Sequence, residues 1–218
     1  MNTVNPAPSA IALPDEIPVF PLTGVLLLPR GQLPLNIFEP RYKAMVDDAL
    51  KSHRLIGMIQ PREDGSLFTT GCAGKITAFN ETDDGRYEIT LKGLSRFVIG
   101  LELPNTPTGY RRIRANWSDF PKDTDPVGHL NLDRNRLRDL LRNYFDMEGM
   151  DCEWSAMETV SDDNLITCLS MVCPLDSSEK QALLEARCGN TRSELFMTLL
   201  EMATRDTSRE HPGKGVCH

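Results

Sequence analysis

The sequence predicts an α+β protein in which a β-rich part with one helix comes first and a helical bundle follows. Up to about Trp117, the apolar residues come in short runs that Pro or Gly interrupts, which is typical of small β domains. After the polar, proline-bearing segment 118–126, apolar residues recur at helical spacing instead. This change of period is the main evidence for the fold class.

The predicted boundaries lie where the composition changes. At 218 residues, the chain is long enough for one large domain or two small ones. We expect a flexible lead-in, a β-rich subdomain, a linker, a helical-bundle subdomain and a flexible tail, at residues 1–16, 17–117, 118–126, 127–205 and 206–218.

Short apolar runs predict the strands of the β-rich part. They lie at 17–20, 25–28, 33–37 and 55–59. Residues 39–52 interrupt them with apolar side chains at helical spacing, which predicts one helix. Residues 71–91 predict a hairpin, because Asp84-Gly85 supplies a turn and the residues after it alternate between apolar and polar. A last strand should turn Ile113 inward and Arg114 outward.

The second half predicts four helices. Leucines and aromatic residues at helical spacing indicate an amphipathic helix over 134–145. Ser161 should begin a second helix, which Pro174 stops.

The last two helices are predicted mainly from their ends. Asp176 with Glu179 three residues later is a variant of the capping box, and Gly189 should end the helix that it opens. Thr191 with Glu194 should cap the final helix in the same way.

Composition limits the classes of function. The net charge of −7 provides no basic field for nucleic acid, and the longest aliphatic run, 25–28, is far too short to span a bilayer. Six cysteines in 218 residues are too sparse for a disulfide scaffold. We therefore expect a cytoplasmic protein with reduced thiols and no contact with membranes.

Motifs for catalysis or for a cofactor are weak. Residues 71–76 lack the spacing and the hydroxyl of a phosphate-binding loop, and Cys168 and Cys173 fit core packing better than zinc binding. We expect no catalytic residue, no cofactor and no metal. A hydrolase that uses Cys72 or His53 in an unrecognised arrangement stays open as an alternative.

One basic cluster allows two interpretations. Arg111, Arg112 and Arg114 lie between Tyr110 and Trp117, and a basic strand with aromatic residues can bind RNA. The same arginines can be the solvated face of an edge strand, whose charges discourage aggregation. The acidic net charge favours the edge-strand interpretation.

Three ordered segments resemble the Lon N-terminal domain, the substrate-binding domain of ATP-dependent Lon proteases. The first is IPVFPLTGVLLLPRGQLPLNIFEPRYKAMVDDAL, residues 17–50, whose most distinctive part is Phe38–Tyr42. The second, 71–99, contains a glycine-led strand, a hairpin and Gly93-Leu94-Ser95-Arg96-Phe97. The third is KQALLE, residues 180–185. The resemblance extends from residue 17 to about 203.

This resemblance implies a PUA-like β pseudo-barrel followed by a helical bundle. It also implies recognition of proteins or exposed peptide segments instead of catalysis, because the ATPase and protease of Lon lie in later domains. About 15 residues follow residue 203, so we expect no room for either activity. Asn36 and Cys72 depart from the family pattern, which usually has His and Thr at these places.

The family motif Phe38-Glu39-Pro40-Arg41-Tyr42 has a structural interpretation. Pro40 suits the first turn of a helix, where a missing N–H costs nothing, and Glu39 suits the positive end of that helix. Arg41 can pair with Glu39, and Tyr42 can bury its ring. We expect a corner that stabilises the fold.

The sequence therefore predicts a non-catalytic domain that binds unfolded or extended polypeptide, or a protein partner, without ATP. Binding is expected in a cleft between the β part and the bundle, with addition of the peptide to an edge strand at 110–117. The candidate peptide-binding residues are Tyr110, Arg112, Arg114 and Trp117. RNA binding by a PUA-like fold is the alternative, and an uncharacterised hydrolase is the third hypothesis.

Overall fold

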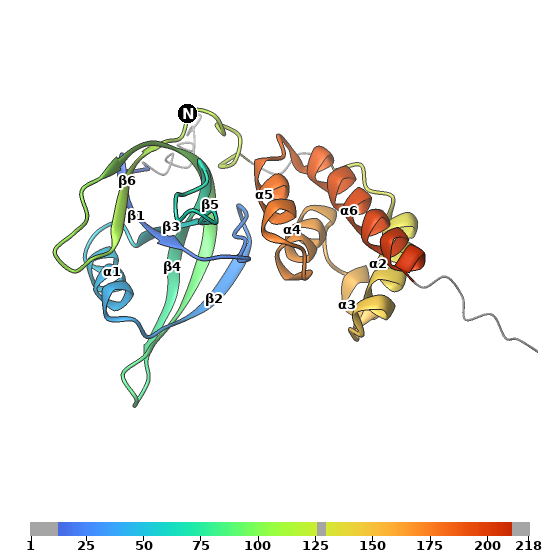
Figure 1. Ribbon diagram of the computed structural model, residues 1–218, viewed down its shortest axis with the longest axis horizontal. Helices are drawn as coiled ribbons and strands as arrows, with labels where there is room; N and C mark the ends of the chain where they lie inside the picture. The colour runs from blue at the N-terminus through green and yellow to red at the C-terminus, as the bar shows by residue number, and fades with distance from the viewer. Residues whose placement is uncertain (1–12, 126–129, 211–218) are drawn as a thin grey trace, which may run out of the picture.

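The structure is a computed structural model that describes the backbone of residues 13–125 and 130–210 and the side chains up to residue 205 in those ranges. Figure 1 shows two lobes side by side: strands and one helix form the β lobe, and the remaining helices form the helical lobe. The α+β class is confirmed, with the strands and one helix first and the other helices after them. The predicted lead-in up to residue 12 and the end of the predicted tail, 211–218, lie outside the described residues.

The β lobe is built on one mixed sheet that closes on itself. Its strands pair in the order β2-β5-β4-β3-β1-β6, and β6 pairs in addition with β5, so five strands form a ring. The length of β5 allows this, because its first half pairs with β2 and its second half pairs with β6. The elements are β1 (Glu16–Pro21), β2 (Gln32–Ile37), α1 (Pro40–Leu50), β3 (Leu55–Ile59), β4 (Thr70–Glu81), β5 (Tyr87–Leu103) and β6 (Arg111–Asn116).

The predicted hairpin is present as β4 and β5, although β5 continues well beyond the expected end at residue 91. Gly85 in its turn has φ +77°, a left-handed conformation that favours glycine. Tyr87, Ile89 and Leu91 are buried while Glu88 is exposed, as the alternation predicts. The turn and the alternation after it, which both depend on residues close together in the sequence, are thus predicted correctly.

Residues 25–28 form a loop instead of the predicted strand, and its three leucines, Leu26, Leu27 and Leu28, are buried. The loop lies against β4 and β5 at two glycines. A Cβ on Gly74 would lie 2.7 Å from Leu27 Cδ2, and a Cβ on Gly93 would collide with the Leu28 carbonyl group. The apolar run is buried by this close approach and not by ladder pairing.

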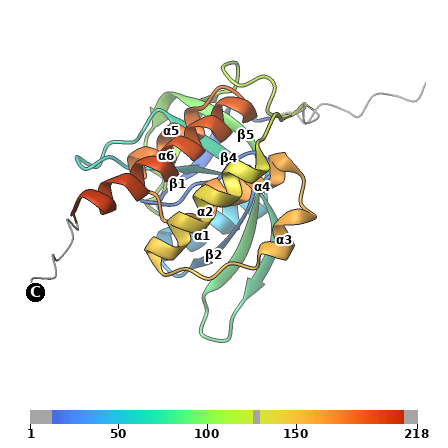
Figure 2. The ribbon, with the colours of Figure 1, turned by 90° about the vertical axis from the view of Figure 1, so that its right-hand side faces the viewer.

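The described residues of the helical lobe form five helices, whereas the sequence predicts four. They are α2 (Arg134–Glu148), α3 (Trp154–Glu158), α4 (Asp162–Val172), α5 (Ser177–Glu185) and α6 (Gly189–Glu210). The short α3 has no predicted counterpart because five residues are too few to show a period. Figure 2 shows α2 and α6 in front of the strands when the molecule is viewed from the helical side.

The ends of α5 and α6 test the capping predictions. The capping box is confirmed: the Glu179 backbone N–H donates to Asp176 Oδ1 (2.8 Å), and the Asp176 backbone N–H donates to Glu179 Oε2 (2.8 Å). Two predictions are wrong, because Gly189 begins α6 instead of ending α5, and Thr191 lies inside the first turn of α6. α5 already ends at Glu185, since the next residue is extended.

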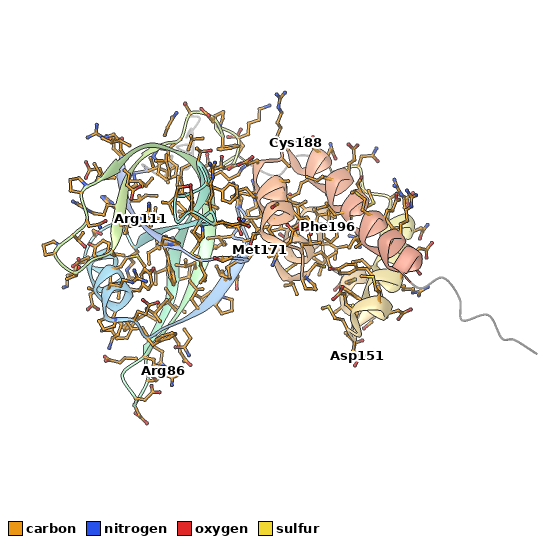
Figure 3. All side chains as sticks on the ribbon, viewed as in Figure 1. Arg86, Arg111, Asp151, Met171, Cys188 and Phe196 are labelled. Carbon is orange, nitrogen blue, oxygen red and sulfur yellow. The ribbon has the colours of Figure 1, made fainter. Side chains whose placement is uncertain are left out.

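One apolar core extends through both lobes. It joins Leu27 and Ile76 of the β lobe to Leu183 and Phe196 of the helical lobe; Phe196 is labelled in Figure 3. A second, smaller cluster around Phe97 includes residues of β1, β3, β4, β5 and β6. Within the described part of the chain, no helix is long and apolar enough to cross a membrane.

Candidate functional site at the junction of the two lobes

The strand at 110–117 is not an edge of the sheet, so the predicted mode of peptide addition is wrong. Residues 111–114 of β6 are paired with β1 on one side, and residues 112–116 are paired with β5 on the other. Both backbone edges of β6 are therefore occupied. The sequence could not show this, because the closure depends on the second half of β5 bending round to β6.

The two aromatic candidates flank β6 and make contacts within the chain. Tyr110 is buried, and its hydroxyl donates to Asp48 Oδ2 (2.8 Å), which ties β6 to α1. Burial, and then this hydrogen bond, raises the pKa of Tyr110 to about 12. Trp117 is half-buried: its Nε1–H donates to the Pro14 carbonyl (3.1 Å), and its ring packs edge-on against Phe97 (centroids 5.9 Å apart).

The basic cluster is largely paired within the chain. Arg111 makes a bidentate contact with Glu102 (2.6 and 2.8 Å). Arg112 and Arg114 lie 4.0 and 3.6 Å from the Glu16 carboxylate. Ile113 and Ala115 alternate inward as predicted. Pairing with acidic neighbours lowers the positive field that RNA phosphates would need.

From its second residue on, the motif 38–42 makes contacts within the chain. Pro40 begins α1 after Glu39, and Arg41 Nη2 pairs with Glu39 Oε2 at 2.8 Å. Tyr42 is buried against Phe20, with ring centroids 4.3 Å apart. Phe38 is 67% exposed, so it does not contribute to the expected corner.

The cleft that the sequence predicts between the two parts exists, and it is polar. It has a volume of about 460 Å³ and receives residues from the loop before β2, from β5, from the predicted linker and from the start of α6. We call it the junction cleft. Cys188, labelled in Figure 3, marks its helical side. Its lining is Pro29, Arg30, Arg96, Lys122, Asp123, Asp125, Leu130, Asp163, Arg187, Cys188, Gly189, Asn190 and Arg192.

A buried ion pair forms the floor of the junction cleft. Arg96 of β5 donates through Nε (2.9 Å) and Nη2 (2.8 Å) to the two carboxylate oxygens of Asp123, whose Oδ2 also accepts from the Arg96 backbone N–H (2.8 Å). The Arg96 Nη1 donates to the carbonyls of Leu184 and Ala186 at the end of α5 (2.9 and 2.6 Å). One arginine thus joins the β lobe, the predicted linker and the helical lobe.

The KQALLE segment attaches α5 to the β lobe by further polar contacts. Lys180 Nζ donates to the Gly24 carbonyl (2.8 Å), and Gln181 Nε2 donates to the Thr70 carbonyl (3.2 Å). Gln60 Nε2 donates to the Ser177 carbonyl at 2.9 Å. Burial lowers the pKa of Lys180. These contacts fix the orientation of α5 beside the cleft.

Arg30 is held at the rim of the cleft in an unusual conformation. Its φ of 69° is left-handed, which is costly for a residue with a Cβ. Its backbone N–H donates to the Gly93 carbonyl (2.8 Å), and its Nη2 donates to the Asp125 carbonyl (2.6 Å). Such strain is common at functional sites.

The residues considered for catalysis or for zinc binding do not come together in one site. Cys72 is fully buried and burial raises the pKa of its thiol, while His53 is exposed, so neither supports a nucleophile with its base. Cys173 is buried as predicted, with its pKa raised to about 12 by burial, but Cys168 is exposed and not in the core. In the described ranges, no group of three or more possible metal ligands gathers.

Comparison with known proteins assigns the family. Residues 16–202 match the family model described as the ATP-dependent protease La (LON) substrate-binding domain. The chain belongs to this family. The family is that of the Lon substrate-binding domain, and the matched range includes both lobes and the junction cleft.

Curated relatives of the family are full Lon proteases. Lon protease 2 of Myxococcus xanthus is 23% identical over 197 residues, which is 86% of this chain and 24% of that protein. The Lon protease of Parabacteroides distasonis is 32% identical over 118 residues, 51% of this chain and 14% of that protein. The chain thus spans a quarter or less of the length of these relatives.

Two solved structures share the fold. A Lon N-terminal domain protein from Xanthomonas campestris has a TM-score of 0.61 at 21% identity and covers 84% of this chain and 97% of its own. The N-terminal domain of a Mycobacterium avium complex Lon protease has a TM-score of 0.56 at 17% identity, with 88% and 98% covered.

Sequence reasoning missed the residues that build the cleft. Arg96 stands inside a segment that the resemblance quotes, but its partner Asp123 is 27 residues away in the predicted linker. Arg192 follows a predicted cap and gives no sign of burial in the sequence. One signal is available in the sequence. Arg96 comes after residues of β5 that alternate between apolar and polar, in a strand whose apolar side is buried, and a charged side chain in such a place needs a partner.

Proposed function

We propose that this chain is a non-catalytic polypeptide-recognition protein that binds unfolded or extended protein segments, or a protein partner, without ATP. The observation that carries the proposal is the match of residues 16–202 to the Lon substrate-binding domain. We transfer to this chain only the substrate-binding role that the family description names. The chain spans only part of its curated relatives, so their other activities are not transferred.

The junction cleft is the proposed binding place. It is concave, it lies between two lobes that share one core, and strained Arg30 stands at its rim. β6, the other candidate, has no free backbone edge to offer. Affinity would therefore come from side chains and carbonyls at the junction.

The structure does not favour either alternative function. The arginines of β6 are already paired with Glu16 and Glu102, which leaves RNA without its basic strand. The hydrolase hypothesis depends on Cys72 or His53, of which Cys72 is fully buried and His53 is exposed on the surface, so the structure does not bring them together as a nucleophile and its base. The five described cysteines are free thiols, which supports the further proposal of a cytoplasmic location.

Fluorescence anisotropy with two labelled probes tests the proposal. A permanently unfolded polypeptide and an RNA of matched length are each titrated with the full chain at roughly 50 and 200 mM salt. We expect saturable binding of the polypeptide that changes little with salt. Binding of RNA alone, with a steep dependence on salt, would establish the alternative instead. Binding of neither probe would refute general polypeptide recognition.

A further inference from the structure

Arg192 is a buried cation without an ion pair. Its exposure is 7%, and its Nε donates to the Leu183 carbonyl at 2.9 Å. Among the described residues, its two terminal nitrogens have no hydrogen-bond partner and no carboxylate within ion-pair distance. Arginine is almost never buried unless it is paired. Burial lowers the pKa of Arg192 to about 10, so it remains a cation at neutral pH.

Asp163 is a second unsatisfied group on the wall of the same cleft. Its Oδ2 is buried and has no hydrogen-bond partner in the described chain. The residue stands in the first turn of α4, and its Oδ1 would lie 3.7 Å from a Cβ on Gly189. A buried acceptor of this kind requires a donor. The carboxylates of Asp123 and Asp163 both favour the charged form of Arg192, but among the described residues neither forms an ion pair with it, and no N–H or O–H reaches Asp163 Oδ2.

The remaining charges of the cleft favour an anion overall. Its lining has five cationic side chains and three carboxylates. Arg96 and Asp123 neutralise each other, which leaves four cations against two carboxylates. At the start of α6, hydrogen bonds from Thr191 lower the pKa of the Cys188 thiol, so this end of the cleft stabilises negative charge.

We propose that the junction cleft binds a carboxylate of a polypeptide ligand, with Arg192 pairing with the carboxylate and Asp163 accepting from a nearby peptide N–H. This inference rests on the proposed function and names the chemistry that the cleft recognises. The carboxylate can be the C-terminal group of a chain or an Asp or Glu side chain, because each lies within a few bonds of a peptide N–H. A fully ionised anion such as sulfate, which carries no N–H or O–H, would leave the Asp163 acceptor without a donor.

Three labelled decapeptides of one neutral sequence test the proposal with the full-length chain. The first ends in a free carboxylate, the second is amidated, and the third is amidated and contains one internal Asp. We expect the first or the third to bind at least tenfold more tightly than the second. Preference for the first assigns the ligand as a chain terminus, and preference for the third assigns it as an acidic side chain.

Substitutions in the cleft test whether the difference in affinity between the peptides arises there. Arg192→Met should reduce the preference for a carboxylate to less than threefold. Because Arg192 is buried and this variant could fail to fold, Arg187→Met provides a second test: Arg187 lines the cleft and is exposed, and its loss should weaken the preference measurably. Lys92→Met changes the net charge equally at an exposed position of β5 outside the cleft lining and should leave the preference unchanged.

The outcomes separate this proposal from the proposed function. Equal binding of all three peptides, together with binding of the unfolded polypeptide, would overturn the carboxylate site and leave polypeptide recognition standing. Failure of the peptides and of the unfolded polypeptide would overturn both. If inorganic phosphate displaces the first peptide as effectively as the unlabelled peptide does, the cleft is a general anion site and the polypeptide assignment is wrong.

Discussion

Replacing Asp123 by Asn should destabilise the whole chain, because it removes the only charge that compensates buried Arg96 in the described structure. The Arg96 and Asp123 side chains are 4% and 8% exposed. The substitution keeps the size of the side chain nearly constant, so it perturbs charge and hydrogen bonding and little else. It also acts on a segment that the sequence predicts to be a linker.

The magnitude follows from the contacts that are lost. Asp123 accepts three hydrogen bonds from Arg96, two at Oδ2 and one at Oδ1. Asn has one acceptor oxygen, and its amide N–H groups would face the N–H groups of the guanidinium. Breaking one partner of a buried pair costs about 3–5 kcal/mol. We therefore expect a loss of about 3 kcal/mol in the free energy of unfolding, or a fall in Tm of about 6–12 °C for a chain of this size.

The assay is urea unfolding followed by circular dichroism and by tryptophan fluorescence. The chain has two tryptophans, Trp117 next to the β lobe and Trp154 in the helical lobe. Trp117→Phe and Trp154→Phe backgrounds therefore report the two lobes separately. Because one apolar core joins the lobes, both signals should change together in the native sequence and shift together to lower urea in the variant.

A loss below about 1 kcal/mol would refute the reasoning, since it would mean that Arg96 tolerates burial without its partner. Asp139→Asn is the matched control at an exposed position of α2, and it should change stability by less than about 0.5 kcal/mol. The double variant Arg96→Met/Asp123→Leu should be more stable than Asp123→Asn, because it removes both charges of the pair and leaves neither buried without its partner.

Three other outcomes are expected. Gly93→Ala should cost about 3 kcal/mol or more in urea unfolding, because its methyl group would collide with the Leu28 carbonyl. Burial, and then the hydrogen bond to Asp48, raises the pKa of Tyr110 from 10.0 to about 12, so its contribution to stability is complete below pH 10 and is lost as the pH rises through 12. Tyr110→Phe should therefore reduce the alkaline loss of stability seen in thermal melts across that window. Asp176→Ala should cost about 1 kcal/mol in the same urea assay, because it removes the capping box of α5.

Each of these outcomes has its own check. Gly100→Ala meets its nearest atom at 3.2 Å and should cost less than Gly93→Ala; equal losses would contradict the close approach at Gly93. An unchanged pH dependence in Tyr110→Phe would show that the hydroxyl does not titrate as described. Asp146→Ala, at an exposed position of α2, should leave stability nearly unchanged, and a loss like that of Asp176→Ala would contradict the capping argument.

The sequence predicts local features of the fold well. The turn at Gly85, the inward direction of Ile113 and the capping box at Asp176 each depend on residues a few positions apart. The prediction of a strand at 25–28 is wrong for the opposite reason, because the conformation of this segment depends on distant parts of the chain. Its burial depends on glycines in β4 and β5, which leave space for the loop where other residues would have side chains.

The candidate site was less predictable because it depends on pairings that are distant in the chain. β6 has the charge pattern of an edge strand, yet the long β5 returns to cover its free side. The sequence predicts a cleft between the two parts, but not its residues. Arg192 gives no periodic signal, and Asp123 lies in a stretch whose composition is that of a solvated linker.

The polar contacts at the junction explain how the cleft keeps one shape. The shared apolar core provides burial, but apolar contacts alone tolerate small shifts of one lobe against the other. Arg96, Lys180 and Gln181 add hydrogen bonds to particular carbonyls, and each such bond is made in only one orientation of α5. Arg192 and Asp163 lie on the helical side of the cleft, so their position relative to Arg30 depends on that orientation. The segments around Arg96 and at 180–185, which carry the family resemblance, thus fix where Arg192 and Asp163 lie relative to the β lobe.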